Sequence, residues 1–157
     1  MRPLLIDMLI ALQTFVVAFV ALHDWAPLPP LNDIASVQAA DSRVRLVTVT
    51  VLSTLPFAFG LGETILHAGG PFPEWLGWYL LVGYGVAVYG MIRAWWGPYL
   101  FYEEPARAAR YEKMFARTHS FLPMRHGIRP NTLHVILHLA IIAIVVDLIV
   151  LQAGRPA

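Results

Sequence analysis

Four long apolar runs constrain the fold of this chain more than any other feature. They cover about residues 4–22, 46–67, 75–92 and 132–151. A helix needs roughly 20 apolar residues to cross a hydrocarbon core of about 30 Å, so each run is long enough to span a bilayer. The runs are continuous and show no alternation with a period of two, which favours helices over a transmembrane β-barrel. We therefore expect an all-α integral membrane four-helix bundle in which residues 1–157 form a single transmembrane domain.

The overall composition agrees with a membrane protein and excludes several classes of soluble protein. Hydrophobic residues make up 58% of the chain and charged residues 13%, against about 45–50% and about 25% in a typical soluble domain. A soluble domain of this size could not bury so much apolar surface. The net charge of +1 gives no general attraction to nucleic acid. The absence of cysteine excludes disulfides, thiolate catalysis and cysteine-ligated metals, and no motif settles whether the chain is an enzyme.

The distribution of Lys and Arg predicts the orientation in the membrane. The connections between runs one and two and between runs three and four hold nine basic residues, namely Arg43, Arg45, Arg93, Arg107, Arg110, Lys113, Arg117, Arg125 and Arg129. The opposite side holds two, Arg2 and Arg155. Because short loops rich in Lys and Arg stay in the cytoplasm, we expect both termini to be extracytoplasmic and both long connections to be cytoplasmic. The expected location is a bacterial inner membrane.

The first long connection predicts a helix that leads into the second run. A proline-rich stretch at 27–30 keeps the chain extended, and Asn32 or Asp33 can then cap a helix. No Gly or Pro follows until Pro56, so one continuous helix is expected from about Asp33 into the second run. Neighbouring hydroxyl side chains can satisfy the carbonyl that a proline frees, so Pro56 is expected to kink this helix rather than end it.

Another helix is expected outside the membrane core, over about residues 105–118. Pro105 suits its first position. At about 100° per residue, one side is basic and carries Arg107, Arg110, Lys113 and Arg117. This pattern predicts an amphipathic helix on the cytoplasmic membrane surface, where each basic residue near anionic lipid contributes about 1 kcal/mol. The basic side can act as a topology anchor or as a docking surface for a partner.

The cytoplasmic layer of ionisable residues centres on three histidines. His134 and His138 are four residues apart, so both rings lie on one face of a helix. With His23 from the end of the first run they form a candidate metal or haem site, because imidazole ligates divalent metals and haem iron. The spacing alone is a weak signal. Two alternatives stay open: histidines hydrogen-bonded near the headgroups, to Asp24 or Asn131, and histidines that handle protons.

The extracytoplasmic layer holds Asp7, Glu63, His67 and Asp147. Ionisable groups cost about 2.5–3.5 kcal/mol at the centre of a membrane helix, so each needs a reason. Glu63 and His67 are four residues apart and can pair. His67 is also the expected partner of Asp147, since no Lys or Arg lies deep in any run. The layer is a candidate proton or cation site. The alternatives are a hydrogen-bonded cluster that stabilises helix packing and a mixed Asp, Glu and His metal site.

Two patterns predict assembly with other membrane helices. Gly83, Gly90 and Gly97 recur every seven residues, and small residues at helical spacing let two backbones approach closely in lipid. Such glycines either pack inside the bundle or face another protomer. His138 and Asp147 are nine residues apart, about 180° around a helix, so we expect them to face different neighbours. These patterns predict a homo-oligomer or a subunit of a larger complex, with its contact at the third run or at the Asp147 face.

Three functional classes fit this sequence. The first is a non-catalytic accessory or self-assembling component of a membrane complex, which the small size, the basic helix and the glycine spacing favour. The second is a haem- or metal-binding membrane protein, redox or oxygen-dependent, that uses the histidine layer. The third is a small proton-coupled transporter that uses the extracytoplasmic carboxylates. The expected partners are membrane lipid and other membrane subunits or copies of this chain, not nucleic acid. The cofactor that the second class requires is haem or a divalent metal.

Overall fold

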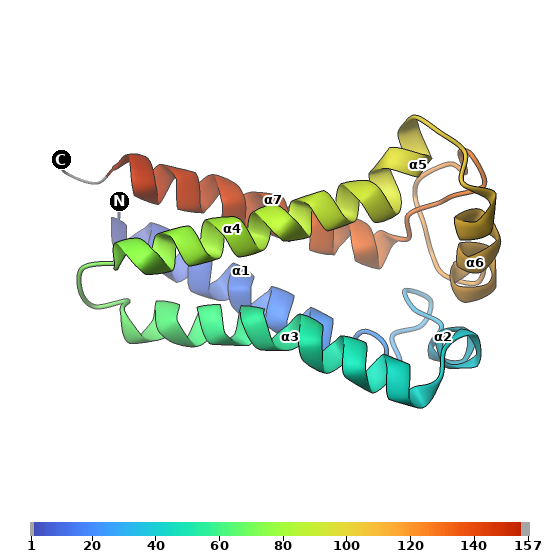
Figure 1. The fold of residues 1–157 in the computed structure, drawn as a ribbon, viewed down its shortest axis with the longest axis horizontal. Coiled ribbons are helices and arrows are strands. Elements are labelled where there is room, and N and C mark those ends of the chain that lie inside the picture. Colours follow the sequence, from blue (N-terminus) through green and yellow to red (C-terminus); the bar gives the residue numbers. More distant parts are fainter. Residues whose placement is uncertain (1, 155–157) are drawn as a thin grey trace.

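The computed structural model describes residues 2–154, and most of them are helical (Figure 1). In chain order the helices are α1 (Arg2–Leu22), α2 (Ile34–Ala40), α3 (Arg43–Leu66), α4 (Glu74–Met91), α5 (Gly97–Leu100), α6 (Pro105–Phe115) and α7 (Thr132–Ala153). A π-helical turn, Ile92–Trp96, joins α4 to α5. No β-strand occurs between residues 2 and 154. The all-α class predicted from the sequence is therefore confirmed.

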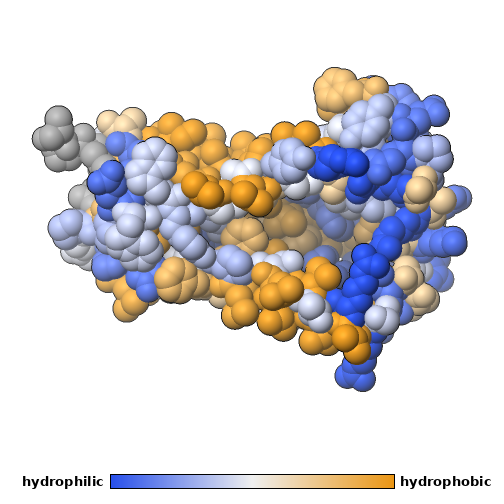
Figure 2. All heavy atoms as spheres, viewed as in Figure 1, coloured by the Kyte–Doolittle hydropathy of each residue, from blue (hydrophilic) through white to orange (hydrophobic). Residues whose placement is uncertain are grey.

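Among residues 2–154, four helices are long and apolar enough to cross a membrane. They are Pro3–Leu22, Arg43–Leu66, Glu74–Leu100 and Thr132–Ala153, which correspond to the four apolar runs. They lie side by side, with the start of α1, the end of α7 and the α3–α4 turn at one end, which we call the terminal end (Figure 1). The opposite end, the polar cap, comprises residues 23–42 and 101–131. Apolar side chains cover the middle of the molecule and hydrophilic ones gather at the cap (Figure 2).

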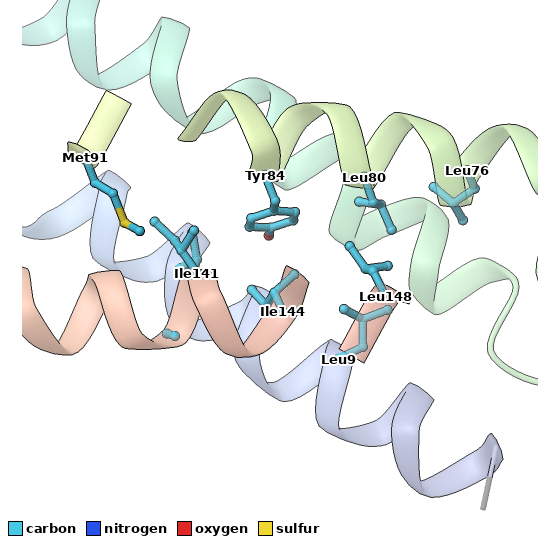
Figure 3. Packing of buried hydrophobic residues seen from close by; sticks show 10 residues of the cluster. Leu9, Leu76, Leu80, Tyr84, Met91, Ile141, Ile144 and Leu148 are labelled. Atoms are coloured by element: carbon cyan, nitrogen blue, oxygen red, sulfur yellow. The ribbon is translucent and has the colours of Figure 1, made fainter. Parts of the chain in front are cut away.

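Helix α7 packs closely against both α1 and α4, and α1 packs closely against both α3 and α7. Helices α3 and α4 pack more loosely against each other. The core between α1, α4 and α7 consists of large side chains, among which Leu9, Ile144 and Leu148 lie opposite Leu80 and Tyr84 (Figure 3). Each of these five residues is at most 2% exposed. Helix α7 is the most buried of the four spanning helices.

The prediction of one continuous helix that leads into the second apolar run is wrong. Asp41 and Ser42 are extended and separate α2 from α3. The Ser42 hydroxyl accepts a hydrogen bond from the backbone N–H of Arg45 at 3.3 Å and so caps α3. The Asp41 carboxylate forms an ion pair with Arg110 of α6 at 2.6 Å, a long-range contact that favours the break. Pro56, in contrast, lies inside α3, which continues through it.

The third spanning helix continues beyond its predicted end, through the π-helical turn into α5. Pro98 has no N–H and cannot donate to the carbonyl of Ala94 four residues earlier. The hydroxyl of Tyr111 in α6 donates to that carbonyl instead, at 3.1 Å. The N–H of Gly97 binds the carbonyl of Ile92 five residues back, which is the π pattern. A side chain of α6 thus satisfies the backbone of the spanning helix at the point where proline disrupts it.

The π-helical turn interrupts the seven-residue glycine pattern. A π-helical turn takes one residue more than an α-helical turn, so it rotates Gly97 relative to Gly83 and Gly90. Gly97 is buried, and a Cβ atom there would lie 3.0 Å from the hydroxyl oxygen of Tyr102. Gly83 and Gly90 have no neighbouring atom within 4 Å of such a position. Gly97 therefore packs inside the chain, while the other two glycines lie beside open space.

Candidate functional site

The polar cap contains an open cavity of about 260 Å³ between α1, α2, α3, α6 and α7, which we call the cap cavity. Six ionisable side chains line it: His23, Asp24, Asp41, Arg45, Arg110 and His134. Trp95, Tyr111 and Phe115 form an aromatic part of the wall. Two of the three predicted metal or haem ligands therefore share one cavity with two acids and two arginines.

His23 lies at the end of α1 and is paired with its neighbour. Its Nδ1 atom lies 3.0 Å from the carbonyl oxygen of Phe19, one turn back, and its Nε2 atom lies 3.3 Å from the carboxylate of Asp24. Burial raises the pKa of Asp24, while the nearby His23 lowers it and Asp41 raises it further. The ring of His23 meets that of His134 edge-on, with their centroids 6.0 Å apart. The two histidines expected to share a layer are therefore neighbours.

His134 is held by aromatic packing and by the residue that caps its helix. The Asn131 side-chain oxygen accepts a hydrogen bond from the backbone N–H of His134 at 2.9 Å and lies 2.8 Å from its Nδ1 atom. Because that oxygen is an acceptor, Nδ1 carries the proton in this contact. The ring packs against Trp95 and Phe115, with centroid separations of 4.5 and 5.4 Å. The predicted hydrogen bond to Asn131 is therefore present.

His138 lies one turn further along α7 and faces Trp96. The indole N–H of Trp96 donates to Nδ1 of His138 at 3.1 Å, and since indole is only a donor, the proton of the neutral imidazole is on Nε2. The ring centroids of His134 and His138 are 6.2 Å apart. Within residues 2–154, no group of three or more His, Asp or Glu side chains is arranged to hold a metal ion. Metal or haem binding by this layer stays a prediction.

Ion pairs join the segments of the polar cap to one another. Asp41 binds Arg45 of α3 at 3.0 Å and Arg110 of α6 at 2.6 Å. Arg117 binds Asp33, the residue that caps α2, at 2.7 Å. Acidic side chains of the same chain therefore bind Arg110 in α6 and Arg117 just after it, so these two arginines do not simply face outward.

A second set of ion pairs joins the start of α6 to the end of the third spanning helix. Glu104 accepts hydrogen bonds from Arg107 at 3.0 Å and from Arg93 at 2.9 Å, and these bonds lower its pKa to about 2. The pKa of Asp33 is also lowered, chiefly by its hydrogen bond to the Ser36 hydroxyl. Lys113, in contrast, is exposed on α6. Of the four basic residues predicted to face lipid, Arg107, Arg110 and Arg117 are paired within the cap.

The residues of the predicted extracytoplasmic layer lie near the terminal end, but they do not form one cluster. Glu63 and His67 pair at 3.7 Å as expected, and Asp7 is exposed. Asp147 is 2% exposed, and neither of its carboxylate oxygens has a hydrogen-bond partner in the described structure. The expected pairing of His67 with Asp147 is therefore wrong, because Glu63, on the same face of α3, is the partner of His67.

Both predicted faces of α7 are buried within one chain. His138 is 4% exposed and Asp147 2% exposed, although they lie on opposite sides of the helix. The two residues can face different neighbours without a second protomer, because α7 packs against both α1 and α4. Since both side chains are buried within the chain, neither of them offers a surface to another protomer.

Two polar residues of the bundle interior, Gln13 and Tyr84, belong to no predicted site. Gln13 of α1 is fully buried, and its amide atoms have no hydrogen-bond partner in the described structure. It lies beside the hydroxyl of Tyr84 of α4, although the two do not meet hydrogen-bond geometry. The signal was a glutamine in the middle of an otherwise apolar run. With Asp147, these side chains give the bundle interior three unsatisfied polar groups, which are costly in lipid.

The cap cavity also depends on residues that no sequence motif singled out. Asp41 and Arg45 are one helical turn apart but are distant in the chain from Trp95, and only the packing of α6 against α2 and against the ends of the spanning helices brings them to one cavity. Compared with protein-family models, with curated proteins and with solved structures, this chain matches none of them.

Proposed function

We propose that this protein is a non-catalytic component of the membrane, which assembles with copies of itself or with other membrane subunits through the outer face of α4. In this proposal both termini are extracytoplasmic, the polar cap is cytoplasmic and α6 lies next to the cytoplasmic leaflet of a bacterial inner membrane. The excess of Lys and Arg in the two cap connections supports this orientation.

The observation that supports the proposal is the shape of the outer surface of α4. At Gly85 and Gly90, no atom of a neighbouring element among residues 2–154 lies within 4 Å of the position that a Cβ atom would take. On the same face of α4 lie Val82, Val86 and Tyr89, which are 63%, 65% and 69% exposed. Bulky side chains beside uncovered glycines form the ridge and gap that a second helix can fill in lipid, where close packing drives association.

Replacing Gly85 or Gly90 by leucine is expected to separate the protomers without unfolding them. Each new side chain would project into the space that a neighbouring backbone occupies, whereas within the chain it would meet open space. The mass of the protein in mild detergent, measured by light scattering, should fall to that of one chain plus detergent.

The matched control is Gly62→Leu on α3. Gly62 also has open space around its Cβ position, so the substitution adds the same apolar volume at another helix and should leave the assembly intact. A wild-type protein that is a monodisperse monomer with no co-purifying subunit would contradict the proposal. An assembly that both α4 variants leave unchanged would move the contact away from α4.

The orientation can be tested by cysteine labelling, because the chain has no native cysteine. We expect Gly69→Cys, in the exposed α3–α4 turn, to react in intact cells with a maleimide that cannot cross the inner membrane. Lys113→Cys, on the exposed side of α6, should react only after the membrane is permeabilised. The reverse pattern would contradict the proposed topology.

A further inference from the structure

A second hollow lies between α3 and α4 in the apolar part of the molecule. It has a volume of about 390 Å³ and is lined by Leu52, Pro56 and Phe57 of α3 and by Gly83, Val86 and Ala87 of α4, among others. The space-filling view shows the surface hollowed between these two helices, with apolar walls (Figure 2). We call this hollow the α3–α4 groove.

The groove is closed near the terminal end and widens toward the polar cap. Near the terminal end the Tyr79 hydroxyl donates to the carbonyl of Pro56 at 2.9 Å, and the rings of Phe59 and Tyr79 pack at a centroid distance of 5.3 Å. Gly60 lets Leu80 approach so closely that a Cβ atom there would lie 2.7 Å from it. Toward the cap α3 and α4 diverge (Figure 1). The groove is therefore a wedge whose wide end points to the cap cavity.

One face of α3 lines both hollows. Its residues Arg45, Leu46 and Val49 border the cap cavity, and its residues Leu52, Ser53, Pro56 and Phe57 border the groove. At about 100° per residue these seven positions fall within an arc of about 140°. A polar cavity at the membrane edge therefore leads along one helix face into an apolar groove that reaches toward the middle of the membrane.

The charges around the cap cavity favour an anionic group. Arg45 and Arg110 share one carboxylate, that of Asp41, which leaves one guanidinium charge in excess and several N–H donors free to bind a further oxyanion. The remaining acid is Asp24, which is paired with His23 and not with either arginine. His134, on the α7 side, is the other histidine of the cavity.

We propose that the cap cavity and the α3–α4 groove together bind one anionic phospholipid, with its phosphate beside Arg45 and Arg110 and an acyl chain along the groove. The groove opens on the face that meets lipid, since Leu52 and Val86 at its two sides are each 65% exposed. The groove borders the proposed assembly face, because Val86 belongs to both, but Gly85 and Gly90 do not line the groove.

The proposal can be tested by titrating the purified full chain in mild detergent with dioleoyl phosphatidylglycerol and counting bound lipids by native mass spectrometry. We expect one phosphatidylglycerol to be retained per chain, with dioleoyl phosphatidylcholine bound at least about tenfold more weakly, because its choline group brings a positive charge beside the arginines and offsets the charge of its phosphate. Inorganic phosphate alone should not displace the lipid, because it makes no contact with the groove.

Two variants test the two halves of the site, each against a matched control. Arg110→Gln should weaken phosphatidylglycerol binding about tenfold or more, whereas Lys113→Gln makes the same charge change on the exposed side of α6 and should not. Gly83→Leu fills the groove without touching the Arg–Asp network and should also weaken binding, whereas Gly62→Leu, which lines neither the groove nor the assembly face, should not. A circular dichroism melt of each variant confirms that it is folded.

Several results would overturn the proposal. Equal losses in Arg110→Gln and Lys113→Gln would show that only the general surface charge matters. Equal binding of phosphatidylcholine would show that the site has no preference for an anionic lipid. Displacement by inorganic phosphate would make the cavity a site for the free anion. If Gly83→Leu changes the assembly mass but not lipid binding, the groove holds a helix of a neighbouring chain. If Arg110→Gln does not fold, Gly83→Leu decides alone.

Discussion

Replacing Trp95 by alanine is expected to lower the free energy of unfolding by about 3–5 kcal/mol, the usual cost of removing a buried aromatic side chain. Trp95 is 5% exposed. Its ring packs against Tyr111 and Phe115 of α6 and against His134 of α7, with centroid separations of 4.3, 5.3 and 4.5 Å. It therefore joins the end of the third spanning helix to the cap and to α7. Unfolding in mixed detergent micelles, followed by circular dichroism, measures the loss.

The matched control is Trp78→Ala on the same spanning helix. Trp78 is 58% exposed, and its indole makes only a long hydrogen bond of 3.4 Å to Glu74. Its removal should change the free energy of unfolding by less than about 1 kcal/mol. Equal losses for the two variants would show that the packing around Trp95 contributes nothing beyond the presence of an aromatic ring.

Replacing Asp147 by leucine is expected to stabilise the protein, by about 1–3 kcal/mol. The side chain is buried, and neither oxygen has a partner in the described structure. A buried polar atom without a hydrogen bond costs about 1–3 kcal/mol, and an apolar side chain of similar size removes that cost. The thermal midpoint in detergent should rise accordingly.

The control for this variant is Asp7→Leu, which removes an exposed carboxylate near the same end of the bundle. It should leave the midpoint nearly unchanged, because water and headgroups can solvate the Asp7 carboxylate. A lower midpoint for Asp147→Leu would show that a water molecule, a proton relay or a bound cation stabilises the native carboxyl group. That outcome would support the proton or cation site predicted for Asp147.

The free energy cost of burying the unpartnered Asp147 side chain bears on function. Ionisable residues are rare inside membranes and mark functional positions, because insertion and packing both select against them. Gln13 and Tyr84 carry further unsatisfied polar atoms in the same core. A bundle selected for stability alone would have apolar residues at these three positions. A gain in stability when one of these polar residues is replaced by an apolar one therefore marks a core position that merits a functional assay.

The sequence by itself determined the helical class and the number of helices that are long and apolar enough to span a membrane. The reason is that both depend on length and apolarity along a continuous segment, which are local properties. The pairing of Glu63 with His67 and the cap of α7 by Asn131 were predictable for the same reason, since each joins residues three or four positions apart on one helix.

Only the tertiary structure decided which ionisable groups share a site. Asp41 breaks the helix between α2 and α3 because Arg110, distant in sequence, is there to bind it. Asp147 is buried because α7 has neighbours on two sides, and Gly97 turns inward because Tyr111 stabilises the π-helical turn before Pro98. In each case the deciding contact joins segments far apart in the chain, and such contacts depend on how the four helices pack, which hydropathy and spacing along a single segment do not encode.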